Sequence, residues 1–163
     1  MNTKTAVRPY QHSDEDAVVD LWARASRQAH PFVEGEGEGE RARRLREIYL
    51  READNWVAEE DGAVVGLLGL LGNEVGGLFV APEAQGRGIG RTLLEHAAAL
   101  HGGLSLKVYE ANARARGFYG AMGFEERGRS TEEETGHPLI VLFRPASPTG
   151  PNRAPRPAGP GRD

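Results

Sequence analysis

The sequence contains no cysteine among its 163 residues, so disulfide bonds, thiolate metal sites and a cysteine nucleophile are excluded. It also lacks an apolar run long enough to cross a membrane. Its amino terminus does not show the basic and apolar regions of a secretory signal peptide. From these absences we expect a cytoplasmic protein that has no membrane partner and no metal site.

Lysine is scarce as well, since Lys4 and Lys107 are the only lysines among 20 basic residues. The formal net charge of −4 argues against a nucleic-acid partner, which would need a basic surface. A hydrophobic content of 39% and a charged content of 27% are typical of a globular domain. We expect one domain over residues 1–145. Residues 146–163 hold five prolines and three glycines without apolar periodicity, which predicts a disordered tail.

Hydrophobic periodicity predicts a mixture of strands and helices along this domain. Short β-prone runs, separated by turns such as Asp61-Gly62, predict strands over 5–10, 55–60, 63–71, 74–80, 104–109, 124–128 and 139–143. Helical spacing predicts helices over 14–27, 41–51, 91–100 and 111–122, and Ser13 is the expected N-cap of the first.

The stretch from Leu78 to Leu94 has the plan of a strand, a glycine-rich turn and a helix. Pro82 ends the strand, because proline cannot continue a hydrogen-bonded ladder. The turn at 85–90 brings unpaired backbone N–H groups to the positive end of a helix, where a phosphate group can bind. Its glycines let the backbone approach a ligand closely, and Arg87 and Arg91 flank it with positive charge.

Known phosphate-binding patterns differ in how well they fit this turn. No glycine is followed by lysine, which excludes a Walker loop, and Arg91 stands where the dinucleotide fingerprint needs its third glycine. The turn resembles motif A of the GNAT family of N-acetyltransferases, Gln/Arg-x-x-Gly-x-Gly/Ala, with Gln85, Gly88 and Gly90. In that family the turn holds the pyrophosphate of acetyl-coenzyme A (acetyl-CoA). The resemblance implies acetyl-CoA binding by Leu78, Phe79, Val80, Gln85, Gly86, Arg87, Gly88, Ile89, Gly90, Arg91, Asn112 and Tyr119.

A second segment, Asn112–Phe124, resembles motif B of the same family, with Asn, a small residue, Phe-Tyr and then Gly-Phe. Gly117 departs from that pattern and costs about 0.5–1 kcal/mol of helix stability. The resemblance covers roughly 7–143 and is to small, single-domain bacterial members. It implies an α/β (α+β) fold with a mixed, mostly antiparallel twisted sheet of about seven strands and about four helices. The strands at 74–80 and 104–109 are then expected to splay apart around the pantetheine arm.

Acetyl transfer to an amine needs a base, an oxyanion site and an acid for the leaving thiolate. Glu74 is the first candidate base, because it has the same offset from Gln85 as the catalytic glutamate of histone-type relatives. His30 or water is the alternative. By resemblance Tyr119 is the general acid, although packing in the core would also explain a tyrosine there, and Phe118 is expected to be core. Asn112, at the start of the helix, is expected to cap it, to bind the cofactor arm, or to do both. A backbone N–H near Phe79 can hold the oxyanion.

The resemblance places the acceptor pocket between the first two helices, which makes Trp22, His30 and Phe32 candidates for substrate binding. An exposed histidine beside a core phenylalanine would also explain His30 and Phe32. The neighbouring Glu-Gly repeat at 34–40 combines glycines, which disfavour a helix, with charges that repel one another. We expect it to be a solvent-exposed, mobile loop. The alternative is an acidic lip that attracts a cationic amine.

The implied function is acetyl-CoA-dependent N-acetylation of a primary amine by direct attack, in a monomer or homodimer. The acceptor is a small molecule or a peptide, and the sequence does not distinguish them. One alternative is an acetyl-CoA-binding sensor or partner subunit without turnover. Another is a toxin-like enzyme that acts on aminoacyl-tRNA, which the net charge of −4 disfavours.

Overall fold

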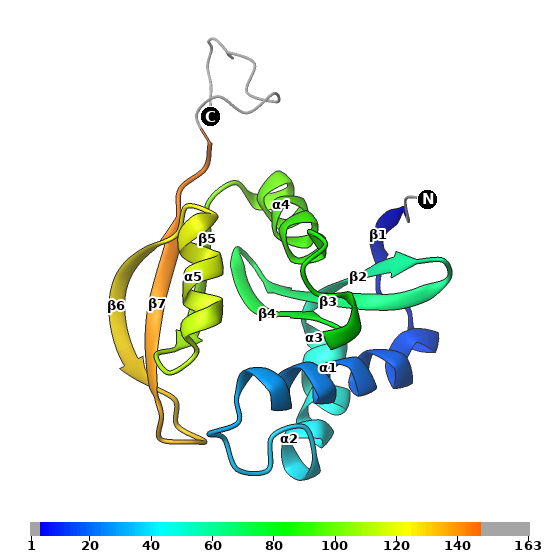
Figure 1. The fold of residues 1–163 in the computed structure, drawn as a ribbon, viewed down its shortest axis with the longest axis horizontal. Coiled ribbons are helices and arrows are strands. Elements are labelled where there is room, and N and C mark those ends of the chain that lie inside the picture. Colours follow the sequence, from blue (N-terminus) through cyan, green and yellow to red (C-terminus); the bar gives the residue numbers. More distant parts are fainter. Residues whose placement is uncertain (1–3, 148–163) are drawn as a thin grey trace.

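The protein is described by a computed structural model over residues 4–147, which form one mixed sheet of seven strands with helices packed on it (Figure 1). The strand order is β1-β2-β3-β4-β5-β7-β6, and only the pair β4 and β5 is parallel. The strands are β1 (Thr5–Pro9), β2 (Asp54–Glu60), β3 (Ala63–Leu71), β4 (Glu74–Val80), β5 (Leu104–Tyr109), β6 (Glu125–Thr131) and β7 (Pro138–Arg144). The expected fold class and all seven strands are confirmed. The predicted tail lies outside the described residues, apart from Ala146 and Ser147.

Besides two 3-10 turns at His12–Asp14 and Pro82–Ala84, four longer helical segments accompany the sheet in the described part of the chain. They are α1 (Glu15–Ala29), a continuous stretch from Gly39 to Glu52, α4 (Ile89–His101) and α5 (Ala113–Ala121). In the second segment a π-helical turn at Leu45–Tyr49 joins α2 (Gly39–Arg44) to α3 (Leu50–Glu52). None of the helices within residues 4–147 has the length and apolar character needed to span a bilayer.

Helices α1 and α4 pack on opposite faces of the middle of the sheet. Gly66 in β3 faces α4, because a Cβ at this position would lie 2.9 Å from Leu93 and 3.2 Å from Ile89. Side chains alternate along a strand, so Leu67 points to the other face, where it lines a groove together with Trp22 of α1. The buried core therefore extends from α1 through the sheet to α4.

The parallel contact between β4 and β5 is short. Only two residue pairs, Glu74 with Ser105 and Val75 with Leu106, are in register, although both strands continue beyond them. At this point the pairing of β4 with β3 also shifts, which leaves Gly76 as the extra residue of a β-bulge. Because a bulge bends its strand, β4 turns away from β5 after Val75. The two strands splay apart as the resemblance implied.

The predicted capping of the first helix by Ser13 is wrong. Helix α1 begins at Glu15, after a 3-10 turn that ends at Asp14. The buried Asp14 carboxylate accepts hydrogen bonds from Arg8 of β1 at 2.9 and 3.0 Å and from the backbone N–H of Gln11 at 2.8 Å. A carboxylate can accept all three bonds, and it thereby joins the first strand to the start of the first helix.

We expect Asp14→Asn to lower the free energy of unfolding near neutral pH by about 1–3 kcal/mol, because it removes the charge that pairs with Arg8. The hydrogen bonds from Arg8, opposed in part by burial, hold the pKa of Asp14 below its ordinary value. The stabilisation is therefore complete above the unfolded-state pKa of about 3.9 and is lost as the pH falls through the lower folded-state pKa.

Urea unfolding of wild type and variant across this pH range measures the effect. Asp16→Asn is the control, since Asp16 lies in the first turn of the same helix but its side chain is 93% exposed. Equal losses in the two variants, or a loss that persists in acid, would contradict the role given to Asp14.

Candidate active site

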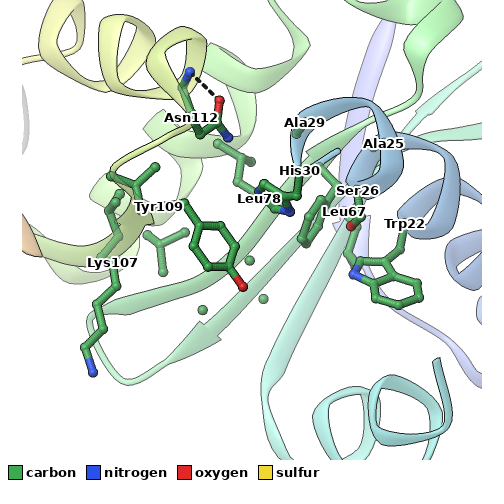
Figure 2. A pocket seen from close by; sticks show the side chains of 18 of the residues that line it. Trp22, Ala25, Ser26, Ala29, His30, Leu67, Leu78, Lys107, Tyr109 and Asn112 are labelled. Atoms are coloured by element: carbon green, nitrogen blue, oxygen red, sulfur yellow. Dashed lines mark hydrogen bonds between the residues drawn. The ribbon is translucent and has the colours of Figure 1, made fainter. Parts of the chain in front are cut away.

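A groove of about 1270 Å³ follows the opening between β4 and β5. Its walls come from the end of α1, from α2, from the glycine-rich loop before α4, from the start of α5 and from the β6–β7 hairpin. Figure 2 shows part of it, with Tyr109 of β5 and Asn112 beside α5 facing His30 at the end of α1. We call the part at 85–91 the loop end, and the part at His30 and the hairpin residues 132–134 the hairpin end.

The loop end is formed by the backbone more than by side chains. Gly86 and Gly88 have φ angles of 81° and 86°, which favour glycine, and Gly88 is the N-cap of α4. The first N–H groups of α4 have no partner within the helix, and the residues that carry them, from Ile89 onward, line the groove. A Cβ at Gly90 would lie 3.4 Å from the ring of Phe118, so α4 and α5 approach closely here. This arrangement suits a phosphate ligand.

The side chains of the loop point in different directions. Gln85 donates hydrogen bonds to a backbone oxygen of β4 at 3.1 Å and to Gln28 of α1 at 2.8 Å, which fixes the loop against both elements. Arg91 lines the groove. Arg87 does not, because its guanidinium lies 3.2 Å from the buried carboxylate of Glu60. Of the two arginines predicted beside the phosphate, the structure brings one to the groove.

Two more predicted residues line the groove here, namely Asn112, the N-cap of α5, and Tyr119, in the last turn of that helix. The Oδ1 atom of Asn112 accepts a hydrogen bond from the N–H of Ala115 at 3.1 Å, so the expected helix cap is present (Figure 2). Tyr119 is buried against the rings of Phe118 and Phe124, with centroids 5.2 and 5.4 Å away. Burial raises the pKa of the Tyr119 hydroxyl, which therefore keeps its proton near neutral pH.

Every other residue predicted to bind acetyl-CoA also lines the groove, and so does Phe118, which we expected to be core. They are Leu78, Phe79, Val80, Gly86, Gly88, Ile89 and Gly90, together with Gln85. The structure thus gathers both family motifs along one cavity, with the exception of Arg87.

The residues predicted on the acceptor side, Trp22, His30 and Phe32, line the groove as well, and so does Glu74. His30 and Phe32 pack against the ring of Tyr109 with centroid distances of 4.8 and 5.3 Å. Edge-on packing of this kind restricts the orientation of all three rings. Glu74 lies where β4 still pairs with β5, and its carboxylate makes no hydrogen bond or ion pair with any residue in 4–147.

The prediction that the Glu-Gly repeat is a solvent-exposed loop is wrong at Glu36. Its side chain is only 3% exposed, and its two carboxylate oxygens contact Nδ1 of His30 at 2.7 Å and Nε of Arg41 at 2.5 Å. Gly35 and Gly37, with φ angles of 75° and 88°, let the chain turn inward at this residue. Burial raises the pKa of Glu36, but the bonds from His30 and Arg41 outweigh it, so the net pKa lies below its ordinary value.

A charged network at the hairpin end was missed by the sequence analysis. Arg41 contacts Glu134 at 2.6 Å and Glu132 at 3.9 Å, and Arg44 contacts Glu134 at 2.8 Å. Glu132 accepts a hydrogen bond from the Tyr109 hydroxyl, and burial together with this bond raises the pKa of Tyr109 to about 12. Arg41 and Glu134 are 93 residues apart, so no local pattern could reveal the pair. Across residues 4–147 no group of carboxylates and histidines is arranged to hold a metal ion.

Comparison with known proteins identifies the family of the chain that forms this groove. A model of an acetyltransferase (GNAT) domain matches residues 51–126. The peptidyl-lysine N-acetyltransferase YiaC of Escherichia coli is 34% identical over 144 residues, which are 88% of this chain and 99% of that protein. The solution structure of apo YjaB from Escherichia coli matches with a TM-score of 0.79 and 33% identity, and covers 88% of this chain and 99% of that one.

A more distant structure shares the fold. The PaiA N-acetyltransferase from Thermoplasma acidophilum, solved in complex with coenzyme A, has a TM-score of 0.70 at 17% identity, over 87% of this chain and 99% of that one. The region matched by the family model contains both the glycine-rich loop and the Asn112–Phe124 segment. The similarity to YiaC runs along nearly the whole of both chains. The chain therefore belongs to the GNAT family and is an N-acetyltransferase.

Proposed function

We propose that the protein transfers the acetyl group of acetyl-CoA to the side-chain amine of a lysine in a peptide or protein. The observation that carries this proposal is the similarity, at 34% identity over 99% of its length, to an enzyme named for peptidyl-lysine acetylation. The groove supports it, because beyond the loop end it continues to a hairpin end with aromatic and acidic side chains. Such side chains attract a cationic amine.

The loop end suits the donor. The N–H groups at the start of α4, together with Arg91, match the charge of a pyrophosphate, and the unpaired edges of β4 and β5 offer hydrogen bonds to the amides of the pantetheine arm. When bound there, acetyl-CoA supplies an acetyl group activated as a thioester. The PaiA N-acetyltransferase, which shares this fold, was solved in complex with coenzyme A, and this is consistent with acetyl-CoA as the donor.

Tyr119 is the proposed general acid. A lysine ammonium loses a proton before its nitrogen attacks, and the departing thiolate gains one. The raised pKa of Tyr119 keeps a proton on its hydroxyl near neutral pH, where it is available to the sulfur. Glu74 and His30 are the two side chains of the groove that we proposed to accept the ammonium proton.

Product analysis tests the acceptor class. We expect the protein to consume acetyl-CoA in the presence of lysine-containing peptides and to leave the acetyl group on the lysine side chain, as read by mass spectrometry. Polyamines and free amino acids are expected to react with a lower kcat/KM. Faster acetylation of those small amines would contradict the peptide assignment. Binding of acetyl-CoA without any acetylated product would favour a sensor.

Donor binding should depend on the backbone of the loop end. Gly88→Glu forces a side chain into a left-handed backbone conformation and adds negative charge where the pyrophosphate is expected, so we predict at least ~10²-fold weaker acetyl-CoA binding by calorimetry. Gly62→Glu is the matched control, because Gly62 has a similar φ of 81° in the β2–β3 turn, away from the groove. Equal affinity of the two variants would refute the placement of the donor.

The role of Tyr119 is tested by Tyr119→Phe, which keeps the ring and removes the proton of the hydroxyl. We expect acetyl-CoA affinity to stay within a few-fold and kcat to fall by ~10²–10⁴-fold, the range of general acid–base catalysis. The loss should shrink at high pH, where a thiolate leaves with less need of a proton. Tyr10→Phe, in a half-buried tyrosine off the groove, is the control. Unchanged turnover in a folded Tyr119→Phe protein would show that Tyr119 contributes to packing and not to catalysis.

A further inference from the structure

The buried Glu36 carboxylate is held on both of its oxygens. Oε2 contacts Nδ1 of His30 at 2.7 Å, and Oε1 accepts a hydrogen bond from Nε of Arg41 at 2.5 Å. The side chain is 3% exposed, and the charge of Arg41 compensates it in the interior. An ionised carboxylate accepts and does not donate, so the neutral His30 ring carries its proton on Nδ1.

That tautomer leaves Nε2 of His30 with a lone pair. Within residues 4–147 no side chain or backbone group makes a hydrogen bond to this nitrogen. The ring lines the groove, and contacts with Phe32 at 5.9 Å and Tyr109 at 4.8 Å between centroids fix its plane. His30 and Leu78 of β4 both line the groove (Figure 2). His30 is thus an oriented proton acceptor that faces the groove.

We propose that His30 is the general base of acetyl transfer and that Glu36 is the residue that positions it, an inference that rests on the proposed function. The N–H bond of the acceptor ammonium breaks and its proton moves to Nε2 of His30. The freed nitrogen lone pair forms the bond to the acetyl carbon. The carbon–sulfur bond then breaks, its electron pair stays on sulfur, and the sulfur takes the proton of the Tyr119 hydroxyl. The new amide nitrogen still holds a second proton, which passes to the Tyr119 phenolate and restores its hydroxyl. His30 then releases its proton to solvent, so that one proton leaves per acetyl group transferred.

The charges around His30 favour this proton transfer. Three carboxylates, of Glu36, Glu132 and Glu134, face the two guanidiniums of Arg41 and Arg44. The network therefore carries one unbalanced negative charge, which a proton on His30 would compensate.

The remaining titratable groups near His30 do not alter that balance. Tyr109 is neutral, because its pKa lies near 12, and it donates its hydrogen bond to Glu132. His137 packs on Phe32 with a centroid distance of 5.0 Å and reaches His30 only through that ring and Tyr109. Five further charged residues line the groove, namely Glu74, Arg91, Lys107, Arg114 and Glu133.

Glu74 is the competing base, and the structure gives it no comparable support. Its carboxylate has no hydrogen-bond partner among residues 4–147, and nothing fixes its direction. A base that is already oriented saves the entropy of finding its position in the transition state. The carboxylate of Glu36 also stabilises the imidazolium that forms on His30. Glu74 has no charged partner among residues 4–147 that could assist proton transfer to it in a similar way.

A double-mutant cycle measures the proposed coupling, with acetyl-CoA and a lysine peptide as substrates. His30→Gln should lower kcat/KM by ~10²-fold or more, and Glu36→Gln by a smaller factor. The double variant should be no worse than His30→Gln alone, because Glu36 acts through His30. Glu38→Gln is the control, since Glu38 belongs to the same Glu-Gly repeat but is exposed and is expected to keep full activity. Full activity of His30→Gln, or losses that multiply in the double variant, would overturn the proposal.

The pH profile of Glu36→Gln separates positioning from a purely structural role. Loss of the negative charge disfavours the imidazolium, so the acidic limb of kcat/KM should move to lower pH while KM changes little. A uniform loss at every pH would show that Glu36 serves only the shape of the loop.

NMR of the histidine rings tests the pair without any acceptor. The signals of His30 in long-range nitrogen spectra are assigned by their loss in His30→Gln. In the wild type they should show the proton on Nδ1. The proton should redistribute toward Nε2 in Glu36→Ala and not in Glu38→Gln. A wild-type ring protonated on Nε2 would overturn the pair even in an active enzyme. The expected tautomer in a protein that acetylates no peptide would instead reject the proposed function.

Discussion

The bulge at Gly76 ends the parallel pairing of β4 and β5 after Val75, and the groove exists because the strands separate from that point. In a continuous sheet the N–H and C=O groups of the two facing edges would satisfy one another, and separated strands leave them for a ligand. The separation also sets the two following helices apart. Helix α4 leaves β4 and α5 leaves β5, and they meet again where Phe118 packs near Gly90. The glycine-rich loop and Tyr119 therefore face one cavity.

The parts of the molecule that depend on local backbone geometry were predictable. The alternation of apolar and polar residues, together with turn residues, predicted all seven strands. The glycines at 86, 88 and 90 indicated the loop end from the sequence alone. The Asn112 cap was predictable for the same reason, because its acceptor bonds an N–H only three residues away. Ser13 failed as a cap because Asp14 has a stronger partner, Arg8, in β1, which local propensity does not include.

The hairpin end could not be predicted, because it is made of side-chain pairs between distant segments. Glu34, Glu36 and Glu38 stand in the same Glu-Gly repeat and look alike in composition. Only the tertiary position of His30 and Arg41 decides that the middle glutamate is buried while its neighbours are exposed. Burial of a charge is costly without compensation, and here two partners supply it. A repeat that composition assigns to solvent thus contributes to the site.

The two ends of the groove differ in how they are built, and this has a consequence for specificity. The loop end uses backbone groups and a helix terminus, so most side-chain substitutions there leave its donors in place. The hairpin end uses a network in which Arg41 touches the Glu-Gly loop and the β6–β7 hairpin at once. Loss of Arg41 or His30 leaves the buried carboxylate of Glu36 with one partner fewer, which disturbs the contacts of its neighbours. Acceptor preference can therefore change through residues of the repeat and the hairpin, while the donor end keeps the same geometry.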